Sequence, residues 1–379
     1  MNTLTEGLVV TTEEPWMPKT ESLTADPCRD SIKLQANFTQ ISEPVRYASF
    51  VLSVLTCALG LVGNALVIWV TGFHMKKHRS KIWFLNLAVA DFAFVLCLPL
   101  YCVALFTDNW PIGRYSCKVY NYVSTCNMYA SIFIITTLTI DRVLATAKPI
   151  WHHKFASRRI YYSTCAVIWV ITALSSLPVF LLSEEVIHGE KVQCKLVNAE
   201  KSSTTLGIRK RDVPRFSSSL ETLSVPETSC DVDIAENYFL TKSILIPFLV
   251  VGYFIPLLVI LFSNIIITRQ VRDSKSVKSP RLYRIIIMVI LFFFLTWTPV
   301  VIAQIILLVS LNNRNLILMS QIHRIMPLMT SIAYTNSCIN PFIYALVGTQ
   351  LREEISGFMS STRKSLSKSS TSGRSYVEQ

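Results

Sequence analysis

Seven long apolar stretches constrain what this chain can fold into. They lie at residues 47–72, 82–106, 115–141, 160–182, 239–268, 285–309 and 325–347. Each reaches the roughly 20 residues that a helix needs to cross a bilayer. Strands do not fit, because open sheet edges are not tolerated in lipid and the stretches are far too long. We therefore expect an all-α membrane protein, built as a bundle of seven transmembrane helices.

The connecting segments predict which end of each helix faces the cytoplasm. The segments after the first, third and fifth stretches are rich in lysine and arginine, whereas the short segments between them hold few. Because short cytoplasmic segments carry the excess of basic residues, we expect a multi-pass protein of the plasma membrane with an extracellular N-terminus. The net charge of +12 follows mostly from this asymmetry, so no nucleic-acid partner is expected.

This orientation divides the chain into three parts. Residues 1–46 form an extracellular tail without the apolar core of a signal peptide, so the first stretch is expected to act as an uncleaved signal anchor. Residues 47–347 form the transmembrane domain, which includes a long outer segment at 183–238 whose mixed charge and serines predict flexibility. Residues 348–379 form a polar cytoplasmic segment.

Four of the ten cysteines lie outside the apolar stretches or at their outer rim, namely Cys28, Cys117, Cys194 and Cys230. In an oxidising exterior they can form two disulfides, with three possible connectivities. The most economical pairing joins Cys117 to Cys194 and leaves Cys28 for Cys230. Asn37 begins an Asn-Phe-Thr sequence in the tail and is expected to carry a glycan.

Polar side chains interrupt the apolar stretches, and Asp91 is the clearest of them. Ionisable groups at bilayer depth are costly and usually functional. Side chains that could face the same interior are Asn64, Asn127, Ser131, Asn336, Ser337 and Asn340. Such a cluster holds either a small hydrated cation with water or a hydrogen-bond network that only joins helices, and the pattern favours neither.

Asp141 and Arg142 follow the third stretch directly, and two prolines lie inside later stretches. Pro299 and Pro341 each remove a backbone hydrogen bond and predict a kink. The Asp141–Arg142 pair either anchors its helix at the membrane surface or acts as a conformational switch.

An ordered set of motifs, one for each stretch, carries a family resemblance. The set comprises "GNALV", "NLAVAD", Trp110, Cys117, "DRV", Trp169, Pro256, "FFLTWTP" and "NPFIY". Over about residues 45–360 the chain resembles the rhodopsin-like G-protein-coupled receptors. Within them, "KPIWHHKF" and "NSCINPFIYALVGTQLRE" are most similar to the chemoattractant receptors, nearest the complement C3a and C5a receptors, with formyl-peptide and chemerin receptors behind them.

The resemblance implies roles for residues near the cytoplasm. Asp141 would hold Arg142 in the resting state, and Arg142 would contact the G protein on activation. Tyr344 would move inward, whereas Asn264 stands where most relatives have a tyrosine that supports the active state. This departure predicts weaker G-protein coupling than the other motifs imply.

The resemblance also assigns the centre of the bundle. Trp297 would lie beneath the ligand, with Phe293 and Pro299 as the packing and hinge elements below it. The expected sodium pocket consists of Asp91, Asn127, Ser131, Asn336, Ser337 and Asn340. No other cofactor and no other metal is expected.

The ligand side departs from the anaphylatoxin receptors. Their arginines and acid that hold a peptide carboxylate correspond here to Ser183, Phe248 and Met326, so the expected anion clamp is absent. Lys242, Arg324 or His323, each near the outer rim, could substitute for it, and the alternative is that they are solvated loop charges. The residues expected to line or rim a peptide-sized cavity are Tyr101, Ser124, Met128, Lys242, Gln304, Arg324 and Tyr334.

We predict from these features a receptor for an extracellular peptide or protein chemoattractant, which signals through Gi and arrestin and is not an enzyme. The alternatives are a non-signalling scavenger of the same family, or a receptor for a formyl peptide, chemerin or a chemokine. A short amphipathic eighth helix around 351–359 would lie on membrane lipid, and the Ser/Thr-rich tail after it suits arrestin once phosphorylated.

Overall fold

The computed structural model of this chain describes residues 42–74, 81–188, 191–196, 241–274, 280–347 and 360. The predicted Cys28–Cys230 disulfide, the glycan on Asn37 and the eighth helix all lie outside the described residues. Residues 197–240 and nearly all of the N- and C-terminal tails also lie outside the described residues. The seven predicted membrane-spanning stretches are described, except for residues 239 and 240.

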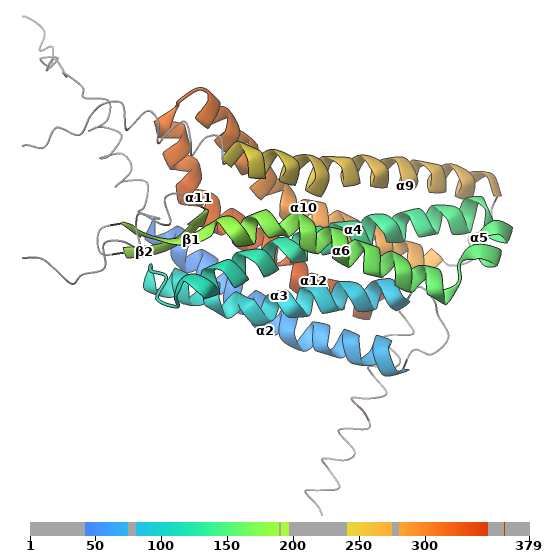
Figure 1. Ribbon diagram of the computed structural model, residues 1–379. Coiled ribbons are helices and arrows are strands. Elements are labelled where there is room, and N and C mark those ends of the chain that lie inside the picture. The colour runs from blue at the N-terminus through green and yellow to red at the C-terminus, as the bar shows by residue number, and fades with distance from the viewer. Residues whose placement is uncertain are drawn as a thin grey trace, which may run out of the picture.

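The described part is a bundle of long, roughly aligned helices (Figure 1). In chain order they are α2 (Glu43–Trp69) continued by the π-helical η1 (Val70–His74), α3 (Lys81–Thr107), α4 (Arg114–Ala147), α6 (Arg158–Leu182), the fifth transmembrane helix (Thr241–Gln270), α10 (Pro280–Asn312), α11 (Leu316–Tyr334) and α12 (Asn336–Val347). The fifth helix includes the π-helical η2 (Val250–Phe254) and most of α9 (Ile255–Ser274), which continues four residues beyond the span. Six helices among the described residues are long and apolar enough to span a membrane. With α11 and α12 as the seventh, the predicted all-α bundle is confirmed.

The seventh predicted stretch is divided at Thr335 and begins earlier than expected. Its α11 starts at Leu316 rather than near 325, because Asn315 caps the helix by accepting the Leu318 N–H at 3.0 Å. Pro341 cannot donate a backbone hydrogen bond to the Ser337 carbonyl one turn before it. The Asn64 amide donates to that carbonyl at 2.7 Å instead, so α2 supports the kinked α12.

Side chains are distributed as a bilayer requires. Apolar residues that face outward are largely exposed, for example Val62 at 73%, Phe262 at 67% and Leu295 at 68%. Polar Asn64 and Asp91 are instead fully buried in the bundle. The hydrophobic surface therefore faces lipid and the polar groups face one another.

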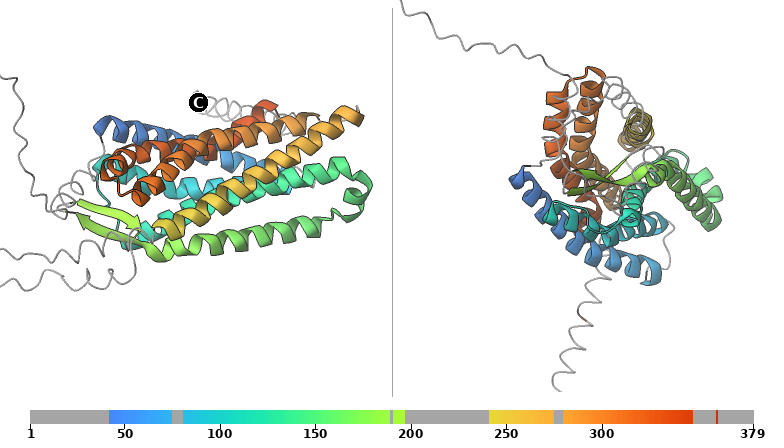
Figure 2. Two further views of the ribbon diagram at one scale, coloured as in Figure 1. Left: turned by 90° about the horizontal axis from the view of Figure 1, so that it is seen from above. Right: turned by 60° about the vertical axis from the view of Figure 1, so that its left-hand side comes forward.

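A β-hairpin and a short helix mark opposite ends of the bundle (Figure 1). Strands β1 (Ser183–His188) and β2 (Lys191–Leu196) pair antiparallel, and seen from that side they lie across the end of the helices (Figure 2). The expected flexibility of 183–238 is therefore wrong for this hairpin. The reason is that Cys194 is bonded to α4, and the Trp110 N–H donates to the Val192 carbonyl at 2.8 Å.

The opposite end carries α5 (Pro149–Phe155), between α4 and α6. Helix α4 continues to Ala147, six residues beyond the predicted limit of 141. Asp141 and Arg142 therefore lie within the helix and not at its end. The helix ends there because Lys148, directly before Pro149, leaves the helical conformation.

Candidate functional site

A cavity of about 410 Å³ opens beneath the hairpin. Four of the predicted ligand residues line it, namely Ser124, Met128, Gln304 and Tyr334. Tyr101, which was expected in the lining, is not among its lining residues, and neither are Lys242 and Arg324, which were expected at the rim. Trp297 contributes to the lining from α10, so the cavity reaches the level of the predicted toggle.

Tyr101 lies behind the cavity wall because it packs against other tyrosines. Its ring stacks on Tyr120 with centroids 5.6 Å apart and meets Tyr334 edge-on at 5.7 Å. The Tyr334 hydroxyl bonds to the Tyr120 hydroxyl at 2.8 Å and to Ser124 Oγ at 3.0 Å. Tyr101 therefore positions Tyr334, which itself lines the cavity.

The basic side chains of the described lining are Lys195 and His323, and no aspartate or glutamate occurs among the described lining residues. His323 was expected as a possible rim cation, whereas sequence reasoning missed Lys195. A usable signal existed, because a residue next to a cysteine bonded to α4 must lie over the bundle. Phe248 and Met326, two of the positions where the anion clamp was expected, line the cavity as apolar walls.

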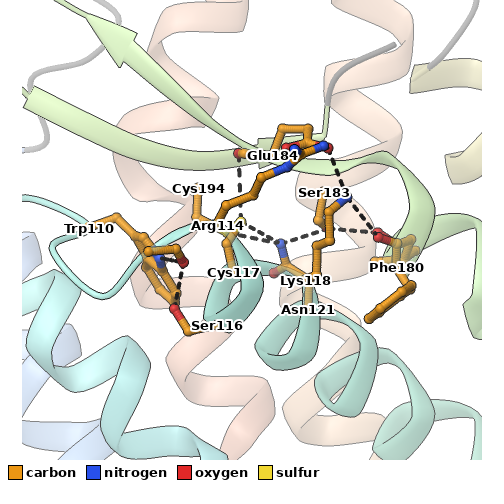
Figure 3. Close-up of a disulfide and its surroundings, with 12 residues drawn as sticks. Trp110, Arg114, Ser116, Cys117, Lys118, Asn121, Phe180, Ser183, Glu184 and Cys194 are labelled. Atoms are coloured by element: carbon orange, nitrogen blue, oxygen red, sulfur yellow. Dashed lines mark hydrogen bonds and ion pairs between the residues drawn. A yellow bond between two sulfur atoms is a disulfide. The ribbon is translucent and has the colours of Figure 1, made fainter. Parts of the chain in front are cut away.

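An ion cluster fixes the hairpin to the N-terminal end of α4 (Figure 3). Buried Glu184 on β1 pairs with Arg114, and Lys118 Nζ lies 2.8 Å from its Oε1. The Cys117–Cys194 disulfide lies beside them, with Cα atoms 5.6 Å apart. Two ion pairs and one disulfide thus hold the hairpin on one helix.

The same cluster sets the charge of Glu184. Burial raises the pKa of its carboxyl, but hydrogen bonds and charge from Arg114 and Lys118 outweigh this and hold the pKa below the ordinary value. Lys118 also donates to the Leu181 carbonyl at 3.2 Å, at the C-terminal end of α6, where a cation is favoured. Glu184 is therefore ionised and already neutralised by neighbouring cations.

Asp91 lies at the centre of the bundle and joins three helices. It accepts hydrogen bonds from the Asn127 and Asn340 amides, each at 2.9 Å, and Ser337 Oγ donates to Asn127 Oδ1 at 3.1 Å. Ser131 Oγ and the side-chain oxygens of Asn336 and Asn340 have no hydrogen-bond partner among the described residues. A carboxylate with unpaired oxygens around it is a donor set that suits a small hard cation with water.

Trp297 and Phe293 form a stacked pair on α10, with ring centroids 5.9 Å apart and planes inclined by 25°. Phe293 is 1% exposed, whereas Trp297 reaches the cavity. Pro299 lies within the same helix. The pair connects the cavity with the core below it.

Asp141 is held by three side chains at the α5 end. Arg142 pairs with its Oδ2 atom, whereas Oδ1 accepts from the Tyr161 hydroxyl at 2.7 Å and lies 2.9 Å from His152 Nε2. The contacts from α5 and α6 were not predicted, because nothing in the sequence indicates how α5 docks. No residue of α10 from Pro280 to Asn312 is acidic, so α10 supplies no competing partner for Arg142.

Asn264 and Tyr344 are not brought together by a described hydrogen bond. The Asn264 amide donates to the Ile260 carbonyl of its own helix at 2.9 Å, and its Oδ1 lacks a partner among the described residues. The Tyr344 hydroxyl likewise has none there, while its ring packs edge-on against Phe84 at 5.0 Å. Both side chains therefore keep unused hydrogen-bonding capacity.

Known proteins match this chain along most of its length. Residues 63–209 and 212–344 match the model of the 7 transmembrane receptor (rhodopsin family). The rat C5a anaphylatoxin chemotactic receptor 1 is 30% identical over 86% of this chain and 80% of its own length. The pig chemerin-like receptor 1 is 32% identical, with 82% and 79% covered. The C3a anaphylatoxin chemotactic receptor of Oncorhynchus mykiss is 30% identical, with 84% and 80% covered.

These matches agree with the geometry of a helical bundle that has a cavity at one end and an Asp-Arg pair near the other. The chain therefore belongs to the rhodopsin family of seven-transmembrane receptors, close to the chemoattractant receptors, and is a multi-pass plasma-membrane receptor and not an enzyme.

Proposed function

We propose that this receptor binds the end of an extracellular peptide or protein chemoattractant beneath the hairpin and signals through Gi and arrestin. The cavity of about 410 Å³ is the observation that carries the proposal. Ligand sites commonly span about 300–1,000 Å³, so this one accepts a few residues of a chain and not a folded protein. The names of relatives that bind C5a, C3a and chemerin agree with such a ligand.

The charges of the cavity favour an anionic end for the inserted peptide. Lys195 and His323 are the basic groups of the described lining, and the other walls are apolar or neutral. A terminal carboxylate near Lys195 would gain a charge-assisted hydrogen bond. We infer that Lys195 takes the place of the missing arginine clamp.

The proposed orientation places the hairpin end outside and the α5 end in the cytoplasm. Ligand beneath the hairpin would shift Trp297 and α10, and the Asp141–Arg142 pair would open to the G protein. That sequence describes a two-state element biased by differential ligand affinity. The sodium pocket around Asp91 would favour the resting state, with Asp91, Ser131 and Asn336 among its donors.

A scavenger that binds ligand without G-protein signalling is the second candidate. Asn264 favours it, because a shorter amide bonded to its own helix stands where relatives use tyrosine. Arg142, which pairs with Asp141, argues against it.

The test measures Gi activation and arrestin recruitment in cells exposed to C5a, C3a, chemerin, formyl peptides and chemokines. The variant Arg142→Ala should lose the Gi response while it keeps surface expression and ligand binding. Arrestin recruitment without any Gi response would support the scavenger instead. Silence in both assays, with the receptor at the surface, would contradict the proposed ligand class.

A further inference from the structure

A second cavity, of about 160 Å³, lies at the α5 end and is named here the α5 pocket. Its walls come from α4, α5 and α6, with Trp83 contributed by α3. Four apolar side chains of the lining are also strongly exposed, at 40% for Ile140, 48% for Trp151, 45% for Phe155 and 50% for Ile160. Since Ile140 and Ile160 lie on transmembrane helices, the pocket faces lipid and not the bundle interior.

Polar side chains of the lining are turned to other partners. Thr137 and Thr164 donate to carbonyls of their own helices at 2.7 Å and 2.8 Å. His152 and Tyr161 bond to Asp141. The pocket therefore offers an apolar surface, which suits a hydrocarbon chain better than a polar ligand.

Basic residues surround the pocket. Those exposed on α5, on its flanks and at the start of α6 are Lys148, Lys154, Arg158 and Arg159. No acidic residue occurs from 142 to 183 in the sequence, and Asp141, the acid among the described lining residues, is paired with Arg142. Anionic lipids of the cytoplasmic leaflet are attracted to such clusters.

We propose that the α5 pocket binds an acyl chain of an anionic phospholipid, whose headgroup lies against the basic residues around α5. The inference rests on the proposed orientation for its cytoplasmic leaflet. A dry apolar cavity of about 150 Å³ accommodates a benzene-sized group, so the pocket holds a segment of chain while the headgroup stays outside. The excess of lysine and arginine in cytoplasmic segments would by itself explain the basic residues. The pocket beside them additionally gives a lipid a defined binding position.

The occupant would also support the resting state. A chain in the pocket packs against His152 and Tyr161, which hold Asp141. Filling the space beside α5 disfavours its movement away from α4. The lipid therefore acts on the Asp141 cluster through the position of α5.

The experiment uses the full chain in nanodiscs that contain photoactivatable phosphatidylserine or photoactivatable phosphatidylcholine, with the reactive group on the acyl chain. Cross-linked peptides are mapped by mass spectrometry. We expect phosphatidylserine to label residues 137–164 about fivefold more than phosphatidylcholine. Ile140→Trp, which fills the pocket mouth, should abolish this labelling, whereas Ile171→Trp, on an equally lipid-exposed site of α6, should not.

Two further variants separate the parts of the proposal. Thr164→Phe fills the pocket from α6 and should reproduce Ile140→Trp. Lys154→Gln with Arg159→Gln should remove the preference for phosphatidylserine and leave the weaker labelling. Equal labelling by both lipids, or labelling that survives both filling variants, would overturn the proposal. The proposal would also be overturned if a soluble helical peptide bound this surface and no lipid labelled it. The assay needs neither agonist nor G protein, and the probe is present in both leaflets. A negative labelling result can therefore be told apart from a failure of the proposed function.

Discussion

Two buried carboxylates, Glu184 at the hairpin end and Asp141 at the α5 end, are held in different ways. The cations that hold Glu184, Arg114 and Lys118, lie one turn apart on a single helix. A disulfide from the same helix to the same hairpin lies beside them. The partners of Asp141 come instead from its own helix, from α5 and from α6, without a covalent link.

This difference indicates which end of the helical bundle can move. Separating the hairpin from α4 would require a covalent bond to break, so the outer frame of the cavity is fixed. Releasing Asp141 requires only hydrogen bonds to be exchanged and α5 to shift. Functional switches use bistable, non-covalent contacts of this kind.

The largest effect should follow from breaking the covalent link. Cys194→Ala should destabilise the receptor by about 2–5 kcal/mol, because it also frees the hairpin that covers the cavity. Surface expression and thermal unfolding in detergent measure the loss. Cys97→Ala, which removes a half-buried free cysteine of α3, is the control and should be near neutral. Equal stability of the two variants would show that the ion cluster alone fixes the hairpin.

The second effect concerns the non-covalent end. Tyr161→Phe removes one hydrogen bond from the Asp141 carboxylate, a contact of about 1.5 kcal/mol, so basal Gi signalling should rise by up to about tenfold. Tyr162→Phe, at the neighbouring and exposed position, is the matched control. Unchanged basal signal with normal surface expression would mean that Arg142 does not depend on this contact.

The third effect tests the ion cluster by pH. Glu184→Gln should cost about 1–2 kcal/mol, less than a fully buried pair because Arg114 is 46% exposed. Since the folded-state pKa of Glu184 is lowered, its contribution is complete above the ordinary value of 4.5 and is lost as pH falls below it. The wild-type and variant melting curves should therefore converge in acid.

Glu185→Gln is the control for this experiment. Burial and the nearby Glu184 charge raise the pKa of Glu185, so its removal should not destabilise the receptor near neutral pH. A stability difference for Glu184→Gln that stays constant as the pH falls would exclude the charge as its cause.

The sequence predicted the helices well because lipid imposes a simple rule on their length and polarity. It also predicted the Asp91 cluster, since polar side chains inside apolar stretches have only one another as neighbours. Of the hairpin contacts, the Cys117–Cys194 pairing was predicted, whereas the ion pairs of Glu184 were not. The contacts of α5 were not predictable, because no periodic pattern indicates which side chains of α5 and α6 reach Asp141.

The smallest predicted effect is on the affinity for a ligand bound beneath the fixed hairpin. Lys195→Gln should weaken a peptide agonist with a free C-terminal carboxylate by up to about fivefold, since an exposed ion pair contributes about 0–1 kcal/mol. The same peptide with an amidated terminus should bind both proteins equally. Lys191→Gln, on the same strand but paired with Asp108 and outside the cavity lining, is the control. If both lysine variants weaken both peptides alike, the hairpin acts only as a rigid cover. If only Lys195 distinguishes the carboxylate from the amide, the fixed end of the receptor also supplies the charge that selects the ligand.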